Sequence, residues 1–254
     1  MTAVAALALL WGAVPAAAAP PAEIDAKSAP LVDALMGALG GLDAWNGLPA
    51  IRFDFVAVKE GKELARRRHW WDKTHGLCRV EWADDQGRSV AAVVNLDDRT
   101  GRSCTAGAAD SDTLLTKHVQ EAYAMWVNDT YWLAMPFKLR DPGVRIAYDR
   151  SEERPQGGYD VLSLTFGDVG LTPEDHYWLF LNRETGRIDR WEYVLQGQKP
   201  PPQAATWEDW RRVGPVTLPL LRTFDQRPAN LRFENVEAPP SFDDRILRDP
   251  CARG

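Results

Sequence analysis

Short segments in which apolar and polar residues alternate recur along most of this sequence, and they constrain the fold more than any other feature. In the clearest of them, Ile51, Phe53 and Phe55 alternate with Arg52 and Asp54. A period of two places the apolar side chains on one face of a β-strand, and the intervening glycine- and aspartate-containing turns are typical of antiparallel neighbours. The further predicted strands are Leu64–Trp71, Leu77–Trp82, Ser89–Asn95, Val144–Tyr148, Tyr159–Phe166, His176–Asn182, Arg187–Leu195, Thr206–Val213, Leu218–Phe224 and Asn230–Val236.

Two segments have a helical period instead. Leu31–Leu39 places apolar residues at helical spacing and is followed by Gly40-Gly41, which ends a helix. A longer helix is predicted from Thr113 to about Trp132, before Pro136. Two helices cannot enclose a core by themselves, and we therefore expect a curved sheet to wrap over them. We therefore predict an α+β, mainly β fold, in which a single curved antiparallel sheet forms an incomplete barrel with helices on its concave side.

The N-terminus has the pattern of an export signal. Residues Ala3–Val14 are apolar and uncharged, and Ala16-Ala17-Ala18 fits an A-x-A cleavage site. The run is shorter than the roughly 20 residues that span a bilayer. We predict a signal peptide over 1–18 with cleavage after about Ala18, a flexible leader over 19–27, one domain over 28–254, and a periplasmic location without a transmembrane anchor. An apolar core helix or a membrane anchor is the alternative.

Charge and motifs exclude several functions. The net charge of −6 argues against a nucleic-acid partner, since phosphate-binding surfaces need a basic excess. Hydrolase, zinc-protease, P-loop and dinucleotide motifs are absent from the sequence, and His69 and His75 match no standard metal-ligand spacing. Glu192 and Glu208 are the one carboxylate pair that we consider for a glycosidase-like enzyme. We predict no catalytic residues, no metal and no cofactor.

Three cysteines remain after the predicted export signal: Cys78, Cys104 and Cys251. An exported protein meets an oxidising compartment, in which one disulfide and one free thiol can form. The sequence does not choose the pair.

Aromatic residues give the strongest indication of a binding site. The 254 residues include 11 tryptophans, spread over many predicted strands and the longer helix. On the concave side of a curved sheet they form a core if the helices fill the space, and they line an apolar cavity if filling is incomplete. The residues that we assign to such a cavity are Phe53, Phe55, Trp70, Trp82, Trp126, Trp132, Trp178 and Trp191.

The sequence also resembles a known family. The segments that carry the resemblance are Ala38–Trp45 with Ile51–Phe55, then Asn128–Val144, Tyr159–Phe166 and His176–Glu192 with its Thr-Gly turn. They are similar to bacterial outer-membrane lipoprotein-sorting (LolA/LolB-like) proteins. The resemblance implies a half-barrel that holds acyl chains between its sheet and its helices.

Carriers of this kind use a basic residue near the helical lid to hold it closed, and the resemblance nominates Arg66 or Arg68 for this role or for a headgroup contact.

The first functional hypothesis is a periplasmic binding protein, and not an enzyme, that carries an apolar ligand such as a lipid or the acyl chains of a lipoprotein. We expect it to act as a monomer. An envelope protein-interaction or stress-sensing module on the same fold is the alternative, with an envelope protein as its partner. A hydrolase of envelope glycans or lipids is the third hypothesis.

Overall fold

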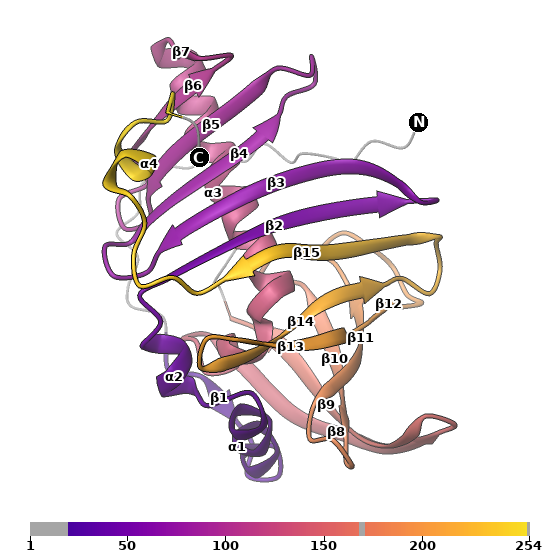
Figure 1. Ribbon diagram of the computed structural model, residues 1–254. Coiled ribbons are helices and arrows are strands. Elements are labelled where there is room, and N and C mark those ends of the chain that lie inside the picture. The colour runs from indigo at the N-terminus through magenta and orange to yellow at the C-terminus, as the bar shows by residue number, and fades with distance from the viewer. Residues whose placement is uncertain (1–19, 168–170, 253–254) are drawn as a thin grey trace.

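The computed structural model describes residues 20–167 and 171–252, which form two β-sheets with a long helix between them (Figure 1). The larger sheet has the order β13 (Glu208–Val213), β14 (Val216–Thr223), β15 (Ala229–Glu237), β2 (Ala50–Lys59), β3 (Lys62–Asp72), β4 (Leu77–Ala83), β5 (Ser89–Asn95), β6 (Gly101–Thr105) and β7 (Ala108–Ala109). The smaller sheet has the order β1 (Glu23–Ile24), β8 (Val144–Arg154), β9 (Gly157–Phe166), β10 (His176–Asn182), β11 (Ile188–Val194) and β12 (Gln203–Thr206).

The prediction of a single sheet is wrong, and the reason lies at Trp207. Thr206 still pairs with Arg190 in the smaller sheet, whereas Glu208 already pairs with Leu221 in the larger one. The buried Trp207 turns the chain between them, and Asp209 follows with a positive φ of 55°. A strand that switches sheets at such an irregularity makes a corner between two packed sheets. The corner falls within the strand predicted over Thr206–Val213, so the sequence pattern hides it.

The predicted helices are confirmed to within two residues. They are α1 (Ala29–Ala38) and α3 (Asp112–Ala134), and α3 contacts the inner face of β4, β5 and β6 before it reaches β14 (Figure 1). Short helices follow each of them: α2 (Leu42–Asn46) after α1 and η1 (Met135–Lys138) after α3. Gly40, between α1 and α2, has a φ of 105°, and a Cβ there would lie 2.5 Å from the Pro215 carbonyl oxygen. Only glycine fits both the backbone angle and this approach.

Part of the expected flexible leader is a strand. Glu23 and Ile24 pair in parallel with Arg145 and Ile146 of β8. Asp25 accepts hydrogen bonds from the backbone N–H groups of Tyr148 and Ser28, both at 2.7 Å. These contacts fasten the chain before α1. The predicted signal peptide, 1–18, lies outside the described residues. Within the described ranges, no helix is long and apolar enough to cross a membrane.

Two apolar clusters fill the space around α3. The larger joins α1, α2, the C-terminal end of α3, β2 and the inner face of the smaller sheet, and includes Leu35, Phe53, Leu133, Trp191 and Leu218. The smaller lies between the first half of α3 and the inner face of β4 and β5, and includes Cys78, Val80, Ala92, Val94, Val119 and Ala122.

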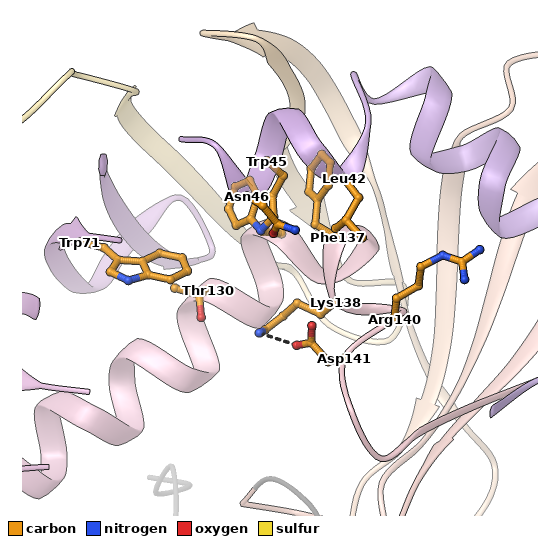
Figure 2. A pocket seen from close by; sticks show the side chains of 10 residues that line it. Leu42, Trp45, Asn46, Trp71, Thr130, Phe137, Lys138, Arg140 and Asp141 are labelled. Atoms are coloured by element: carbon orange, nitrogen blue, oxygen red, sulfur yellow. Dashed lines mark hydrogen bonds and ion pairs between the residues drawn. The ribbon is translucent and has the colours of Figure 1, made fainter. Parts of the chain in front are cut away.

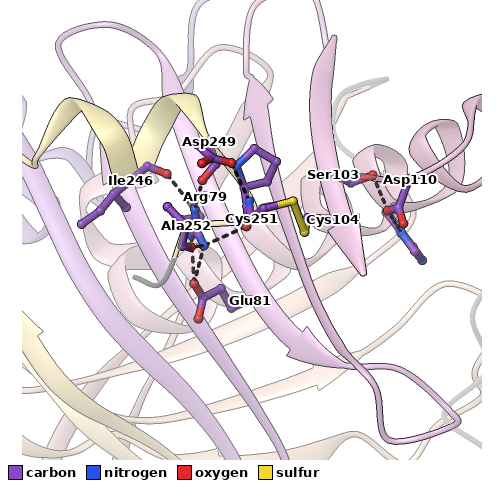
Figure 3. The surroundings of a disulfide bond; sticks show 11 residues. Arg79, Glu81, Ser103, Cys104, Asp110, Ile246, Asp249, Cys251 and Ala252 are labelled. Atoms are coloured by element: carbon purple, nitrogen blue, oxygen red, sulfur yellow. Dashed lines mark hydrogen bonds and ion pairs between the residues drawn. A yellow bond between two sulfur atoms is a disulfide. The ribbon is translucent and has the colours of Figure 1, made fainter. Parts of the chain in front are cut away.

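A disulfide joins Cys104 to Cys251 and fastens the C-terminal segment to the outer face of the larger sheet (Figure 3). α4 (Asp244–Arg248) belongs to this segment. The buried Arg79 guanidinium donates to the carbonyl oxygens of Ile246 at 2.8 Å and Asp249 at 3.0 Å, and it pairs with Glu81 (Figure 3). Cys78 is free, since it lies in the inner cluster on the opposite face from this disulfide. Burial raises the pKa of its thiol well above the usual range.

Candidate functional site

A buried polar cluster joins α3 to β3. The Asp129 carboxylate of α3 accepts from Arg67 Nη2 at 2.6 Å and lies 2.8 Å from His69 Nε2. Asp129 and His69 are both fully buried, and the His69 ring stacks on Phe53 with centroids 4.4 Å apart. Burial lowers the pKa of His69, although Asp129 opposes the shift. Among the described residues His69 Nδ1 has no hydrogen-bond partner, so we assign the proton to Nε2, which donates to Asp129.

An aromatic stack joins another face of α3, near its C-terminal end, to the smaller sheet. Trp132 lies 4.5 Å from Trp191 between ring centroids, and Trp191 lies 5.1 Å from Trp207. The guanidinium of the fully buried Arg222 lies 3.8 Å from the Trp207 ring centroid and donates to the Trp132 carbonyl oxygen. Burial lowers the pKa of Arg222 well below the usual range of an arginine.

Six of the eight residues that we assigned to the cavity face the interior. They belong to or pack against the two apolar clusters around α3, where their side chains contact one another and the helix. In the structure these six side chains fill the core, so they fit the alternative interpretation, an aromatic core. The six are Phe53, Phe55, Trp82, Trp126, Trp132 and Trp191.

The other two, Trp70 and Trp178, lie on outer faces, so their assignment to the cavity is wrong. Trp70 faces away from α3, between the guanidinium groups of Arg52 at 5.2 Å and Arg79 at 5.8 Å. Trp178 stacks on His176 at 3.9 Å, in a cluster on the outer face of the smaller sheet. Each of the two is adjacent in sequence to a residue that faces inward. Apolar residues lie on both faces of each sheet, so alternation does not reveal which face is inside.

The nominated lid residues, Arg66 and Arg68, are also on the outer face of the larger sheet. Arg66 pairs with Asp54 at 3.0 Å, and Arg68 lies 3.5 Å from Glu81. Among the described residues, the ion pairs of both arginines are with strands of the larger sheet and none is with a helix, so the structure gives the lid assignment no support. Strand alternation places their neighbour Arg67 on the inner face, where it and Arg222 are the arginines that hold α3.

A cavity of about 180 Å³ opens between α2 and the end of α3 (Figure 2). Trp45, Trp71 and Phe137 form its apolar walls, and the Trp45 and Phe137 rings stack with centroids 4.8 Å apart. Ligand pockets commonly measure about 300–1,000 Å³, so this cavity holds only part of a lipid-sized molecule in the present conformation. The residues that line it are Leu42, Trp45, Asn46, Trp71, Thr130, Ala134, Phe137, Lys138, Arg140 and Asp141.

Cationic side chains surround this opening. Lys138 pairs with Asp141 at 3.0 Å, and Arg140 pairs with Asp33 of α1 (Figure 2 shows the first pair). The Lys73 ammonium lies 4.2 Å from the centroid of Trp45, one of the rings that wall the cavity. Burial and the nearby Lys138 charge lower the pKa of Lys73 to about 8.

The walls of this opening were not among the predicted site residues. Trp71 and Trp45 stood in the aromatic and family patterns, but neither pattern placed them together. Lys73 lies in the β3–β4 turn, where lysine is ordinary, and its partner Trp45 comes 28 residues earlier in the chain. One sequence signal pointed to this site: Trp71 and His69 are two residues apart on β3, and this spacing puts both side chains on the same face of the strand.

A second, wider groove of about 440 Å³ lies over β13, β14 and β15. There β14 pairs with β15 only from Leu221 to Thr223, so the earlier part of β14 diverges from its neighbour. Charged residues form much of the groove's lining, which includes Asp209, Arg211, Arg212, Leu220, Arg232, Phe233 and Glu234.

Comparison with known proteins finds similarity through the structure only. No family model matches the chain, and no curated protein does. A LolA superfamily protein from Nitrosomonas europaea is 11% identical, with a TM-score of 0.48 over 82% of this chain and 96% of that one. A DUF1329 family protein from Desulfovibrio piger is 8% identical, with a TM-score of 0.46 over 87% and 96%. An outer membrane lipoprotein-sorting protein domain from Vibrio parahaemolyticus is 8% identical, with a TM-score of 0.42 over 84% and 97%.

Proteins of the lipoprotein-sorting type are among the structural neighbours, at TM-scores below 0.5. Identities this low do not transfer an activity. The function must be built from the cavity and the contacts of this chain.

Proposed function

We propose that this protein binds the apolar part of a lipid or an acylated molecule at the opening between α2 and α3. The observation that carries the proposal is the cavity walled by Trp45, Trp71 and Phe137 and bordered by basic side chains. Concave apolar sites with a few convergent polar groups are the usual form of a small-molecule binding site. The protein would act as a carrier or sorting factor and not as an enzyme.

The cavity must enlarge to accept a whole acyl chain, and the structure offers a way. α1 and α2 meet at Gly40 and Gly41, whose φ angles of 105° and 95° suit a hinge. In the apolar clusters around α3, Trp126 Nε1, Tyr131 OH and Trp191 Nε1 are buried without hydrogen-bond partners among the described residues. Each such group costs roughly 1–3 kcal/mol. A closed state that contains several of them is easier to open than a fully satisfied core.

The location that we propose is the periplasm, after removal of residues 1–18. The Cys104–Cys251 disulfide supports this, because disulfides persist in oxidising compartments and are rare in the cytosol. We further propose that the protein acts as a monomer that receives its ligand from an envelope donor.

Binding is tested by filling the cavity. Ala134 of α3 is buried and lines the opening, whereas Ala124 on the same helix is exposed. Ala134→Met adds a side chain to the cavity, and Ala124→Met is the matched control. We expect wild type and Ala124→Met to bind an apolar dye and to lose it to lipid, and Ala134→Met to bind about tenfold more weakly, as expected for the loss of one well-packed apolar contact.

Native mass spectrometry on protein purified from a periplasmic fraction then identifies a co-purified lipid. Wild-type protein that carries no lipid and binds no dye would overturn the proposal.

A protein-binding role is the second candidate, and the groove beside β14 favours it. An unpaired stretch of strand is a template for an extended peptide. Arg212 and Arg232 border the groove without an ion-pair partner within the described ranges, so the occupant would be an acidic extended segment of an envelope protein. Replacing both arginines with glutamine would abolish capture of such a segment and leave dye binding unchanged.

A further inference from the structure

Lys73 has an unusual environment for a lysine in a surface turn. Its ammonium lies 4.2 Å from the ring centroid of Trp45 and 5.5 Å from that of Trp71, and both rings wall the cavity. It donates one hydrogen bond to the Trp45 carbonyl oxygen near the end of α2. An ammonium has three donors, so two of them are left for another partner.

The charges around the opening do not balance. Lys138 is neutralised by Asp141 and Arg140 by Asp33. For Lys73, no carboxylate lies within ion-pair distance among residues 20–167 and 171–252. Contact with two indole faces offsets part of the cost of removing an ammonium from water, at roughly 0.5–2 kcal/mol, but it supplies no counter-charge. One uncompensated, half-buried positive charge therefore lies beside two of the aromatic rings that wall the cavity.

We propose that Lys73 binds the anionic head, a phosphate or a carboxylate, of the amphiphile whose apolar chain enters the cavity. The inference rests on the proposed function and specifies its ligand as an anionic single-chain or acylated molecule. Trp45 and Trp71 would contact the first carbons of the chain, and Lys73 would fix the head at the mouth. Lys138 and Arg140 would add a weaker attraction, since each already has a partner.

Protonation gives this assignment a signature that a structural lysine lacks. The pKa of Lys73 is about 8 in the free protein, because of burial and the nearby Lys138. A bound anion favours the charged form and raises this pKa, so binding above pH 8 takes up a proton. Affinity for the anion must then fall as pH rises above 8. The other charged groups around the opening, Lys138, Arg140, Asp33 and Asp141, stand in ion pairs.

The experiment compares two ligands that share one acyl chain, lysophosphatidic acid and monoacylglycerol, each below its micelle concentration. Binding is followed by tryptophan fluorescence and calorimetry at pH 7 and pH 9. Lys73→Met removes the charge and keeps an apolar stem, and Lys73→Arg keeps the charge. Lys62→Met, at an exposed lysine that begins β3, is the matched control. Inorganic phosphate alone tests whether a free anion binds without a chain.

We expect wild type to prefer the anionic lipid by about tenfold at pH 7, the size of one charge-assisted hydrogen bond at a partly exposed site. The preference should shrink at pH 9, disappear in Lys73→Met and return in Lys73→Arg, while the control matches wild type. Inorganic phosphate should not compete at matched ionic strength.

Equal binding of both lipids by wild type and Lys73→Met would overturn the role of Lys73 and leave the proposed function intact. Binding of neither lipid by wild type would overturn both. Tight binding of phosphate alone would assign Lys73 to a free anion and also contradict the proposal.

Discussion

Two faces of α3 are held by different kinds of contact. Against the larger sheet the helix uses buried polar groups as well as the apolar cluster with β4 and β5: Asp129 contacts Arg67 and His69, and His118 lies 2.7 Å from Asp110, which accepts from Ser103 of β6. Against the smaller sheet it uses rings, with Trp132 packed on Trp191, Tyr193 and Phe224. The contacts with the larger sheet thus include directional hydrogen bonds, whereas the contacts with the smaller sheet are aromatic packing.

This difference indicates which part of the molecule is fixed and which can adapt. Hydrogen bonds in a buried network depend on distance and direction, so they restrict the position of α3 on the larger sheet. Aromatic pairs also have preferred geometries, but offset-stacked and edge-to-face arrangements are both favourable, so a ring pair has more than one acceptable arrangement. The cavity opens beside Thr130 and Ala134, between the hydrogen-bonded contacts and the aromatic contacts of α3. We infer that the larger sheet is the frame, and that opening occurs on the side of α2 and the smaller sheet.

The largest effect expected from a single substitution concerns the aromatic side. Trp191 is fully buried and contacts Trp132, Tyr177 and Trp207, so Trp191→Ala should lower the free energy of unfolding by about 3–5 kcal/mol. Trp178→Ala removes the same side chain from the outer face of the same sheet and should cost about 1 kcal/mol or less. Urea unfolding curves measure both. Equal losses would show that the aromatic stack does not hold the two sheets together.

Most of the elements could be predicted from the sequence, because alternation and helical spacing are local signals. Which face of a strand is inside could not be predicted for β3, where Trp70 and Trp71 adjoin. The C-terminal segment, held by Arg79 and the Cys104–Cys251 disulfide, covers the outer face near Trp70. Burial on both faces removes the contrast on which the sequence pattern depends.

The candidate site was less predictable than the fold, since its parts come from separate turns and helix ends. Lys73, Trp45 and Phe137 have no periodic relation to one another, and only the tertiary structure brings them together. The corner at Trp207 was hidden for a related reason: it falls within one predicted strand, and only the pairing of Thr206 and Glu208 with different sheets reveals it. Local sequence patterns contain no information on which strands are neighbours in a sheet.

A smaller effect is expected from the polar side. Asp129→Asn leaves Arg67 and the fully buried His69 without their carboxylate, and should lower the free energy of unfolding by about 2–3 kcal/mol. The loss is below the maximum for a buried ion pair because Arg67 is partly exposed. Asp244→Asn, which breaks an exposed pair with Arg248, should cost less than about 0.5 kcal/mol. If both variants unfold at the same urea concentration as wild type, the polar cluster does not anchor α3.

The smallest effect is a pH dependence that separates the two sides further. Burial lowers the pKa of His69 below its unfolded value near 6.5, so the unfolded state binds more protons just below that pH. Stability from this group is therefore present at neutral pH and is lost as pH falls from about 6.5 toward the folded pKa. His69→Gln keeps a donor for Asp129 but does not titrate, so its stability should fall less than that of wild type between pH 7 and pH 5. His75→Gln alters an exposed histidine and should follow wild type. If wild type and His69→Gln lose the same stability over this range, the acid sensitivity arises from other groups and not from the polar cluster that contacts α3.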